Sequence, residues 1–159
     1  MKFSLVDALV SLESGKSITM IKQVSLAEEY LADHFPDFPV LPGVMMLEAA
    51  VQAAAWLVRD FDAFRHSLVV LREAKGIRYG TFVSPGNALQ VHAEVVRIDA
   101  QGSEFKIRGT VGQATAIQGR IELTHKNLAD THAELGRLDS VMIEHLRRQW
   151  QQLQRASAA

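Results

Sequence analysis

The stretch that decides the fold reads HFPDFPVLPGVMMLEAAVQAAAWLVR and covers residues 34–59. Three of the chain's four prolines lie between residues 36 and 42, and each fixes its own φ and holds the preceding residue in extended backbone. From Val44 to Arg59 the sequence is rich in alanine, leucine and methionine, which are strong helix formers. We therefore expect a stiff loop followed by a helix over residues 44–59 that is apolar on nearly every side and surrounded by protein.

The sequence on both sides of this helix is typical of β-strands separated by turns. Ser25 stands three residues before Glu28, which is a capping-box pattern and predicts a short helix over residues 26–31. The extended segments are 3–13 and 17–24, joined at Ser14-Gly15, and then 67–79, 88–98, 104–111 and 116–124. About six strands around one apolar helix predict an α+β fold in which an antiparallel sheet wraps around the helix.

The composition excludes several classes of protein. The chain has 159 residues, of which 48% are hydrophobic and 22% charged, as in an ordinary single globular domain. Its formal net charge of -1, without a basic run, argues against a nucleic-acid partner. The absence of cysteine excludes disulfides, thiolate metal sites and a cysteine nucleophile, and it fits a reducing, cytoplasmic location. Asp7 precedes any apolar run, so we expect no signal peptide.

The apolar stretch from Val40 to Val58 is not expected to insert into a membrane. Pro42 and Gly43 interrupt its start, and Glu48 and Gln52 stand in its middle. An ionisable group is costly at the centre of a bilayer, so a helix buried in a protein core is the better interpretation. Glu48 therefore requires an explanation.

The residues capable of chemistry concentrate in the same stretch. His34 lies in the stiff loop, Gly43 at the expected helix start, and Glu48 and Gln52 four residues apart on one helix face. Unpaired N–H groups at a helix N-terminus suit an oxyanion, and Glu48 lies roughly 7 Å further along the helix. A histidine and a carboxylic acid together can move protons in both directions. This set supports proton removal next to a carbonyl with departure of a hydroxyl group.

The competing interpretation of these residues is purely structural. In it, Glu48 is a buried carboxyl satisfied by Gln52, and His34 caps a turn. The residue types alone leave both interpretations open.

The segment HFPDFPVLPGVMMLEAAVQA, residues 34–53, strongly resembles the HFPGxPxxPGvLxLEAxxQ segment of the FabZ-type 3-hydroxyacyl-acyl-carrier-protein dehydratases. The spacing of His34, Gly43, Glu48 and Gln52 is that of the family. A weaker resemblance covers Ser84-Pro85-Gly86-Asn87, which is similar to the family's later PGD turn, and the strand order from Leu5 to about Leu123.

The resemblance implies a single hot-dog domain, with the central helix held in a long antiparallel sheet, assembled as homodimers that can form trimers of dimers. Each site then takes a histidine from one chain and the acid from the other. In the implied roles His34 abstracts the α-proton, and Glu48 protonates the departing hydroxyl group. The Gly43 N–H stabilises the thioester oxygen, and Gln52 orients Glu48.

The implied reaction is dehydration of (3R)-hydroxyacyl thioesters to trans-2-enoyl thioesters in fatty-acid or related lipid biosynthesis, with neither cofactor nor metal. The substrate is carried on the phosphopantetheine of acyl carrier protein and lies in an apolar tunnel between subunits. The residues expected to contact it are Phe35, Pro42, Val44 and Met45.

Basic residues near the implied tunnel mouth are candidates for docking the acidic carrier protein. They are Arg72, Lys75 and Arg78, and a solvated strand face is the alternative. The remaining histidines lack metal-ligand spacing, so no metal is assigned and surface positions are expected for them: His66, His92, His125, His132 and His145.

Three features depart from the family pattern. Asp37 replaces the glycine after His-Phe-Pro and adds a charge near the expected base. Asn87 replaces the aspartate of the PGD turn, and residues 68–71 read LVVL where family members often carry tyrosines that gate the tunnel.

Two other functions stay open. A hot-dog thioesterase would use Glu48 to activate water, but hydrolysis does not need the His34 loop in this form. A non-catalytic acyl-binding protein would keep the fold and lose the acid–base pair, yet both residues are present.

The C-terminal region lies beyond the usual family end. We expect residues 1–126 to form the hot-dog domain and residues 127–159 a helical extension packed on it. A helix over 139–155 carries an apolar stripe: Val141, Met142, Leu146, Trp150 and Leu153. Because the concave face of the sheet is filled by the central helix, we expect this helix on the outer face of the sheet or at the tunnel mouth, where it would influence chain-length selection.

Overall fold

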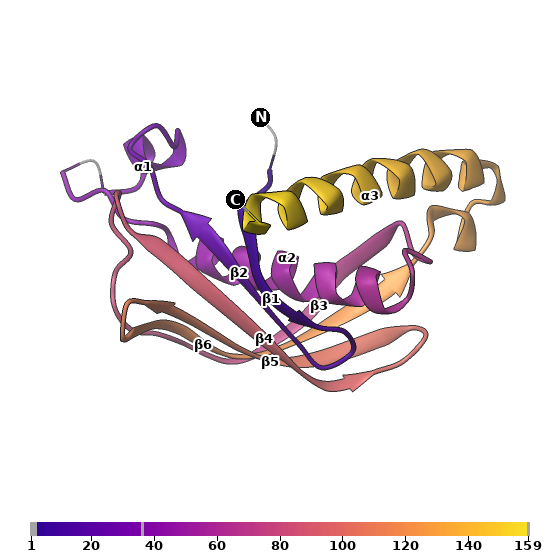
Figure 1. The fold of residues 1–159 in the computed structure, drawn as a ribbon, viewed down its shortest axis with the longest axis horizontal. Coiled ribbons are helices and arrows are strands. Elements are labelled where there is room, and N and C mark those ends of the chain that lie inside the picture. The colour runs from indigo at the N-terminus through magenta and orange to yellow at the C-terminus, as the bar shows by residue number, and fades with distance from the viewer. Residues whose placement is uncertain (1–2, 36, 159) are drawn as a thin grey trace.

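The fold is built on one six-stranded antiparallel sheet, and helices lie on one side of it (Figure 1). The computed structural model describes residues 3–35 and 37–158, and Met1, Lys2, Pro36 and Ala159 lie outside this part. The strands are β1 (Ala8–Glu13), β2 (Ser17–Gln23), β3 (Leu68–Tyr79), β4 (Ala88–Ile98), β5 (Gly102–Val111) and β6 (Ala114–Lys126). Their order in the sheet is β1-β2-β4-β5-β6-β3, which leaves β1 and β3 as the edges. The predicted α+β hot-dog architecture is confirmed.

Helix α2 (Gly43–Phe61) fills the concave face of this sheet. The small residues Ala49, Ala53 and Ala54 are fully buried and let the helix backbone lie close to the strands. On the sheet side, strand β4 alternates, with Leu89, Val91 and Ala93 buried and the residues between them exposed. The predicted central helix is confirmed, with two residues more at its C-terminal end.

The short helix expected over residues 26–31 is displaced. Helix α1 covers Tyr30–Asp33, and the Ser25 hydroxyl accepts a bond only from the N–H of Ala27, at 3.2 Å, in a local turn. The Glu28 carboxylate that the capping box requires is bound to the buried Lys22 ammonium at 2.5 Å. The prediction was wrong because the ion pair with buried Lys22 of β2 outcompetes the cap.

The C-terminal helix α3 (Gly136–Ala158) follows two 3-10 turns, Leu128–Asp130 and Ala133–Leu135. It does not cover the outer face of the sheet. It lies on the same side as α2, above that helix and against β1 (Figure 1). Trp150 is buried and stacks on Trp56 of α2, with ring centroids 5.5 Å apart. The outer-face alternative was wrong, because the sheet covers only one side of α2 and leaves an apolar side for α3, whereas Val141 of the predicted stripe is exposed.

The start of α3 is anchored by the buried carboxylate of Asp139. It accepts a hydrogen bond from the Ser67 hydroxyl. It also accepts hydrogen bonds from the N–H groups of Leu128 and Ala129, both at 2.9 Å. Burial alone would raise the pKa of Asp139, but these bonds outweigh it and hold the pKa below its ordinary value. In the described part of the chain, no helix combines the length and hydrophobicity required to cross a bilayer.

Candidate active site

The Glu48 carboxyl is held by a fixed network on α2. Its Oε1 accepts a hydrogen bond of 2.9 Å from Gln52 Nε2, one helical turn away. Gln52 is itself clamped by the N-terminal segment, because its Oε1 accepts from the Leu5 N–H at 2.8 Å and its Nε2 also donates to the Phe3 carbonyl at 3.1 Å. These bonds fix which way the Gln52 amide points, so the amide presents an N–H to Glu48.

A cavity of about 230 Å³ runs along the face of α2 that bears Glu48. It lies between α2, the N-terminal segment, Val69 of β3 and helix α3, which contributes Leu146 and Gln149. Its full lining is Phe3, Ser4, Glu48, Val51, Gln52, Ala55, Trp56, Arg59, Val69, Leu146 and Gln149. The lining combines apolar side chains with five polar or charged residues, so the cavity suits a ligand that has both apolar and polar parts.

Gly43 is the first residue of α2, so its N–H belongs to the helix end that lacks intrahelical partners. Pro42 precedes it, and the Pro42 carbonyl accepts the N–H groups of Met45 and Met46 at 2.9 and 3.1 Å. A Cβ added at Gly43 would lie 2.9 Å from Cε1 of Tyr79, so the glycine lets the tyrosine ring lie against the helix start.

His34 lies in the loop between α1 and α2 and is half-buried. The loop is tied to the chain after β3, because Phe38 contacts Phe82 edge-on at 5.4 Å and the Leu41 N–H donates to the Val83 carbonyl at 2.8 Å. Phe35 has a φ of 51°, which is uncommon for a bulky residue and is found at functional sites. His34 does not line the cavity that holds Glu48, so one chain does not bring the two together there.

The four expected substrate contacts have different environments in a single chain. Phe35 and Val44 are exposed, Met45 is half-buried and Pro42 is buried. Asp37, the departure from the family motif, is exposed in the His34 loop.

The basic residues of β3 separate into two groups. Lys75 and Arg78 lie in a groove on the outer face of the sheet together with Lys106, Arg108 and Arg120, whereas Arg72 lines a different pocket. Lys75 is paired with Glu122 at 2.7 Å and with Glu73 at 3.1 Å. The hydrogen bonds that the Lys75 ammonium donates to these carboxylates raise the pKa of Lys75.

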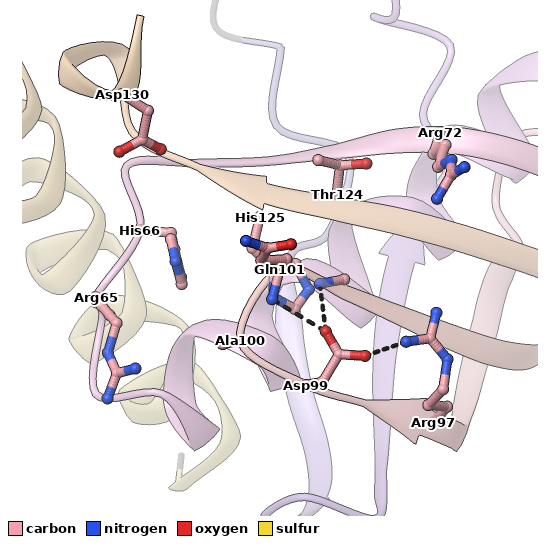
Figure 2. A pocket seen from close by; sticks show the side chains of 11 residues that line it. Arg65, His66, Arg72, Arg97, Asp99, Ala100, Gln101, Thr124, His125 and Asp130 are labelled. Atoms are coloured by element: carbon pink, nitrogen blue, oxygen red, sulfur yellow. Dashed lines mark hydrogen bonds and ion pairs between the residues drawn. The ribbon is translucent and has the colours of Figure 1, made fainter.

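Figure 2 shows the pocket that Arg72 lines, near the C-terminal end of α2 and the turn between β4 and β5. It measures about 880 Å³ and contains none of the expected catalytic residues. His125 is buried beside it, 2.8 Å from the Ser103 hydroxyl and with its ring 5.7 Å from that of His66. The surface position expected for His125 was wrong, because residues 116–126 continue the strand alternation and turn this side chain inward. Within residues 3–35 and 37–158, no group of three potential ligands could hold a metal ion.

Sequence relatives identify the family. Residues 11–120 match the ApeI-like family, described as ApeI dehydratase. The 3-hydroxyacyl-acyl-carrier-protein dehydratase FabZ of Albidiferax ferrireducens is 36% identical over 132 residues, covering 80% of this chain and 87% of the relative. The FabZ of Janthinobacterium sp. is 36% identical over 136 residues, with 83% and 86% covered. The chain belongs to the FabZ-type dehydratases. The FabZ-type resemblance of residues 34–53 is thereby confirmed.

Solved structures similar to this FabZ-type chain support the fold. A chain of the ApeI:P dehydratase heterocomplex from Xenorhabdus doucetiae superposes with a TM-score of 0.68 at 16% identity, covering 84% of this chain and 90% of that one. The fluoroacetyl-CoA thioesterase FlK superposes with a TM-score of 0.60 at 16% identity, with 79% and 96% covered. Because both a dehydratase and a thioesterase share the architecture, the fold does not separate the two activities.

Two residues of this FabZ-type chain were missed by sequence reasoning. Tyr79 covers the start of α2. It lies at the far end of β3 from residues 68–71, the positions where family members often carry tyrosines. Arg59 lines the Glu48 cavity, and the signal that marks it is a charged residue eleven positions after Glu48, on the same face of the helix.

Proposed function

We propose that this protein removes water from (3R)-hydroxyacyl thioesters carried by acyl carrier protein and forms trans-2-enoyl thioesters in fatty-acid or related lipid biosynthesis. The observation that carries the proposal is the Glu48 carboxyl, which Gln52 orients within a cavity of a FabZ-type chain. Residues 1–126 are the proposed catalytic domain, and residues 127–159 are the extension packed on it.

The proposed reaction needs a base, an acid and an oxyanion donor. The His34 imidazole of one protomer removes the α-proton, and the electron pair of the broken C–H bond forms the C=C bond. The β C–O bond breaks while Glu48 of its partner protonates the departing oxygen, so that water leaves. The Gly43 N–H, at the positive end of α2, stabilises charge on the thioester oxygen. Phe35, Pro42, Val44 and Met45 are the proposed contacts of the substrate, which needs no cofactor beyond its own phosphopantetheine arm.

The edge strand β3 supports a homodimer. It is twelve residues long, pairs with β6 on one side only, and bears exposed apolar side chains at Val70, Leu71 and Tyr79. A long exposed edge is normally covered or paired, and a second copy of the chain pairs it most simply. A dimer would also bring a second His34 loop to the Glu48 cavity. Trimers of dimers and the cytoplasmic location stay predictions.

The groove of Lys75, Arg78, Lys106, Arg108 and Arg120 supports docking of an acidic carrier protein on the outer face of the sheet. Arg72, which lies elsewhere, is the weakest of the three proposed docking residues.

The test is incubation with 3-hydroxyacyl and enoyl thioesters, with products identified by mass spectrometry. Dehydration removes the mass of one water, hydration of the enoyl thioester adds it, and thioester hydrolysis releases a free acid. We expect His34→Ala and Glu48→Gln each to lower turnover by about 10²-fold or more without loss of folding. Mixing the two inactive variants under subunit exchange then restores activity from one intact site per mixed dimer. Release of free acid as the main product would refute the proposed reaction.

A further inference from the structure

Arg59 is a half-buried cation that the proposed dehydration does not use. Its guanidinium lies over the Trp56 ring, with Cζ 5.2 Å from the ring centroid. Its Nε is buried and has no hydrogen-bond partner within the described part of the chain. The nearby acidic group is Asp62, whose Oδ2 is held by His66 Nδ1 at 2.6 Å.

The charge on Arg59 is kept despite its burial. Burial lowers the pKa of Arg59 to about 10 and the Asp62 charge opposes this, so the side chain is a cation at neutral pH. The Nε donor of Arg59 is buried without a partner, and leaving a buried donor of a charged group unpaired is costly unless a ligand or a function compensates it.

Arg59 and Glu48 lie at opposite ends of one cavity. Glu48, Gln52, Ala55 and Arg59 follow one face of α2, and all four line the same space of about 230 Å³. Eleven positions along a helix correspond to roughly 16 Å. The reacting carbons lie at the Glu48 end in the proposed reaction, so the far end of the acyl chain points towards Arg59.

We propose that Arg59 is a specificity-determining residue that selects acyl chains ending in an oxygen acceptor, a carboxylate best of all, over chains ending in a methyl group. The inference rests on the proposed function, which sets the direction of the chain. The cavity walls between the two ends include Val51, Ala55 and Leu146, which suit a methylene chain. A carboxylate at the Arg59 end accepts from the unpaired Nε donor and forms charge-assisted hydrogen bonds with the cation.

The experiment compares two 3-hydroxyacyl thioesters with the same number of heavy atoms, one ending in a carboxylate and one in a methyl group. A series of acyl chain lengths identifies the length at which the chain end reaches Arg59. For the wild-type protein we expect kcat/KM to favour the carboxylate by at least about 10-fold at that length. Arg59→Met, which keeps the length of the side chain and removes its donors, reverses the preference. Arg148→Met on α3, where the arginine is exposed and paired with Glu144, leaves it unchanged.

The same preference is measured by calorimetry as the ratio of the Kd values of the corresponding unreactive amides, so it is obtained even without turnover. An inactive wild-type protein that still prefers the carboxylate amide contradicts the proposed function and supports the role of Arg59. Active protein with equal or greater preference for the methyl-ended chain overturns the inference and leaves the proposed function standing. An unchanged ratio of carboxylate to methyl preference in folded Arg59→Met also overturns the inference. This holds as well if the variant weakens the dimer but leaves the ratio unchanged.

Discussion

Replacing Trp150 by alanine tests whether α3 is a structural part of the domain. The side chain is 5% exposed and lies nearly parallel to Trp56, with 14° between the ring planes. Truncating a buried tryptophan removes its transfer free energy and leaves a cavity, which costs about 3–5 kcal/mol. Part of this is the aromatic pair, which contributes about 0.5–1.5 kcal/mol beyond the buried area. A domain with a typical stability of about 5–15 kcal/mol remains folded but is clearly weakened.

The assay is urea unfolding followed by far-UV circular dichroism, with the free energy of unfolding extrapolated to water. Val141→Ala is the matched control, because Val141 lies on the same helix but is 55% exposed, and a change within about 0.5 kcal/mol is expected. The fluorescence of Trp56, the tryptophan that remains, reports separately on undocking of α3 through the loss of its stacked neighbour.

A destabilisation below about 1 kcal/mol in Trp150→Ala, or one equal to that of the control, refutes the docking of α3 on α2. Truncation after Leu138 extends the test. Lost stability with unchanged chain-length preference assigns α3 a structural role, and a shifted preference at equal stability makes it a lid on the cavity. A truncation that changes neither quantity contradicts the docking argument.

Three further predictions concern the candidate active site, the buried histidine of β6 and the edge strand. Gln52→Ala frees the Glu48 carboxyl and lowers kcat on the order of 100-fold, with KM nearly unchanged, in steady-state kinetics; equal kcat would remove Gln52 from the mechanism. The pKa of His125 is lowered by burial and by neighbouring His66, so its stability contribution is complete above about pH 6.5 and is lost as the pH falls through the lowered folded-state pKa. In His125→Gln the change of the thermal unfolding temperature with pH should disappear over this range. An unchanged pH dependence would assign it to other titratable groups. Val70→Lys on the edge of β3 shifts light scattering from dimer to monomer and lowers activity, whereas Val96→Lys within β4 does not; a dimer retained in Val70→Lys places the interface elsewhere.

Local sequence was sufficient for the central part of the fold. Proline geometry and helix propensity act over a few residues, so residues 34–59 alone predict the loop and the helix that the structure shows. Strand alternation likewise located β4 and β5 within two residues at each end. The spacing of Glu48 and Gln52 predicted that they share a helix face, because that spacing is a property of the helix itself.

Features that depend on distant partners were decided only by tertiary structure. The capping box at Ser25 failed because the fold buries Lys22 of the preceding strand β2 and pairs it with Glu28, and His125 is inside because of its strand register. The amphipathic stripe of α3 requires an apolar surface but does not say which one, and the stacking of Trp150 on Trp56 selects the free side of α2. The same packing encloses Arg59 in the cavity that holds Glu48. Burial and uncompensated charge arise from contacts between segments far apart in the chain, and local propensity contains no information about them.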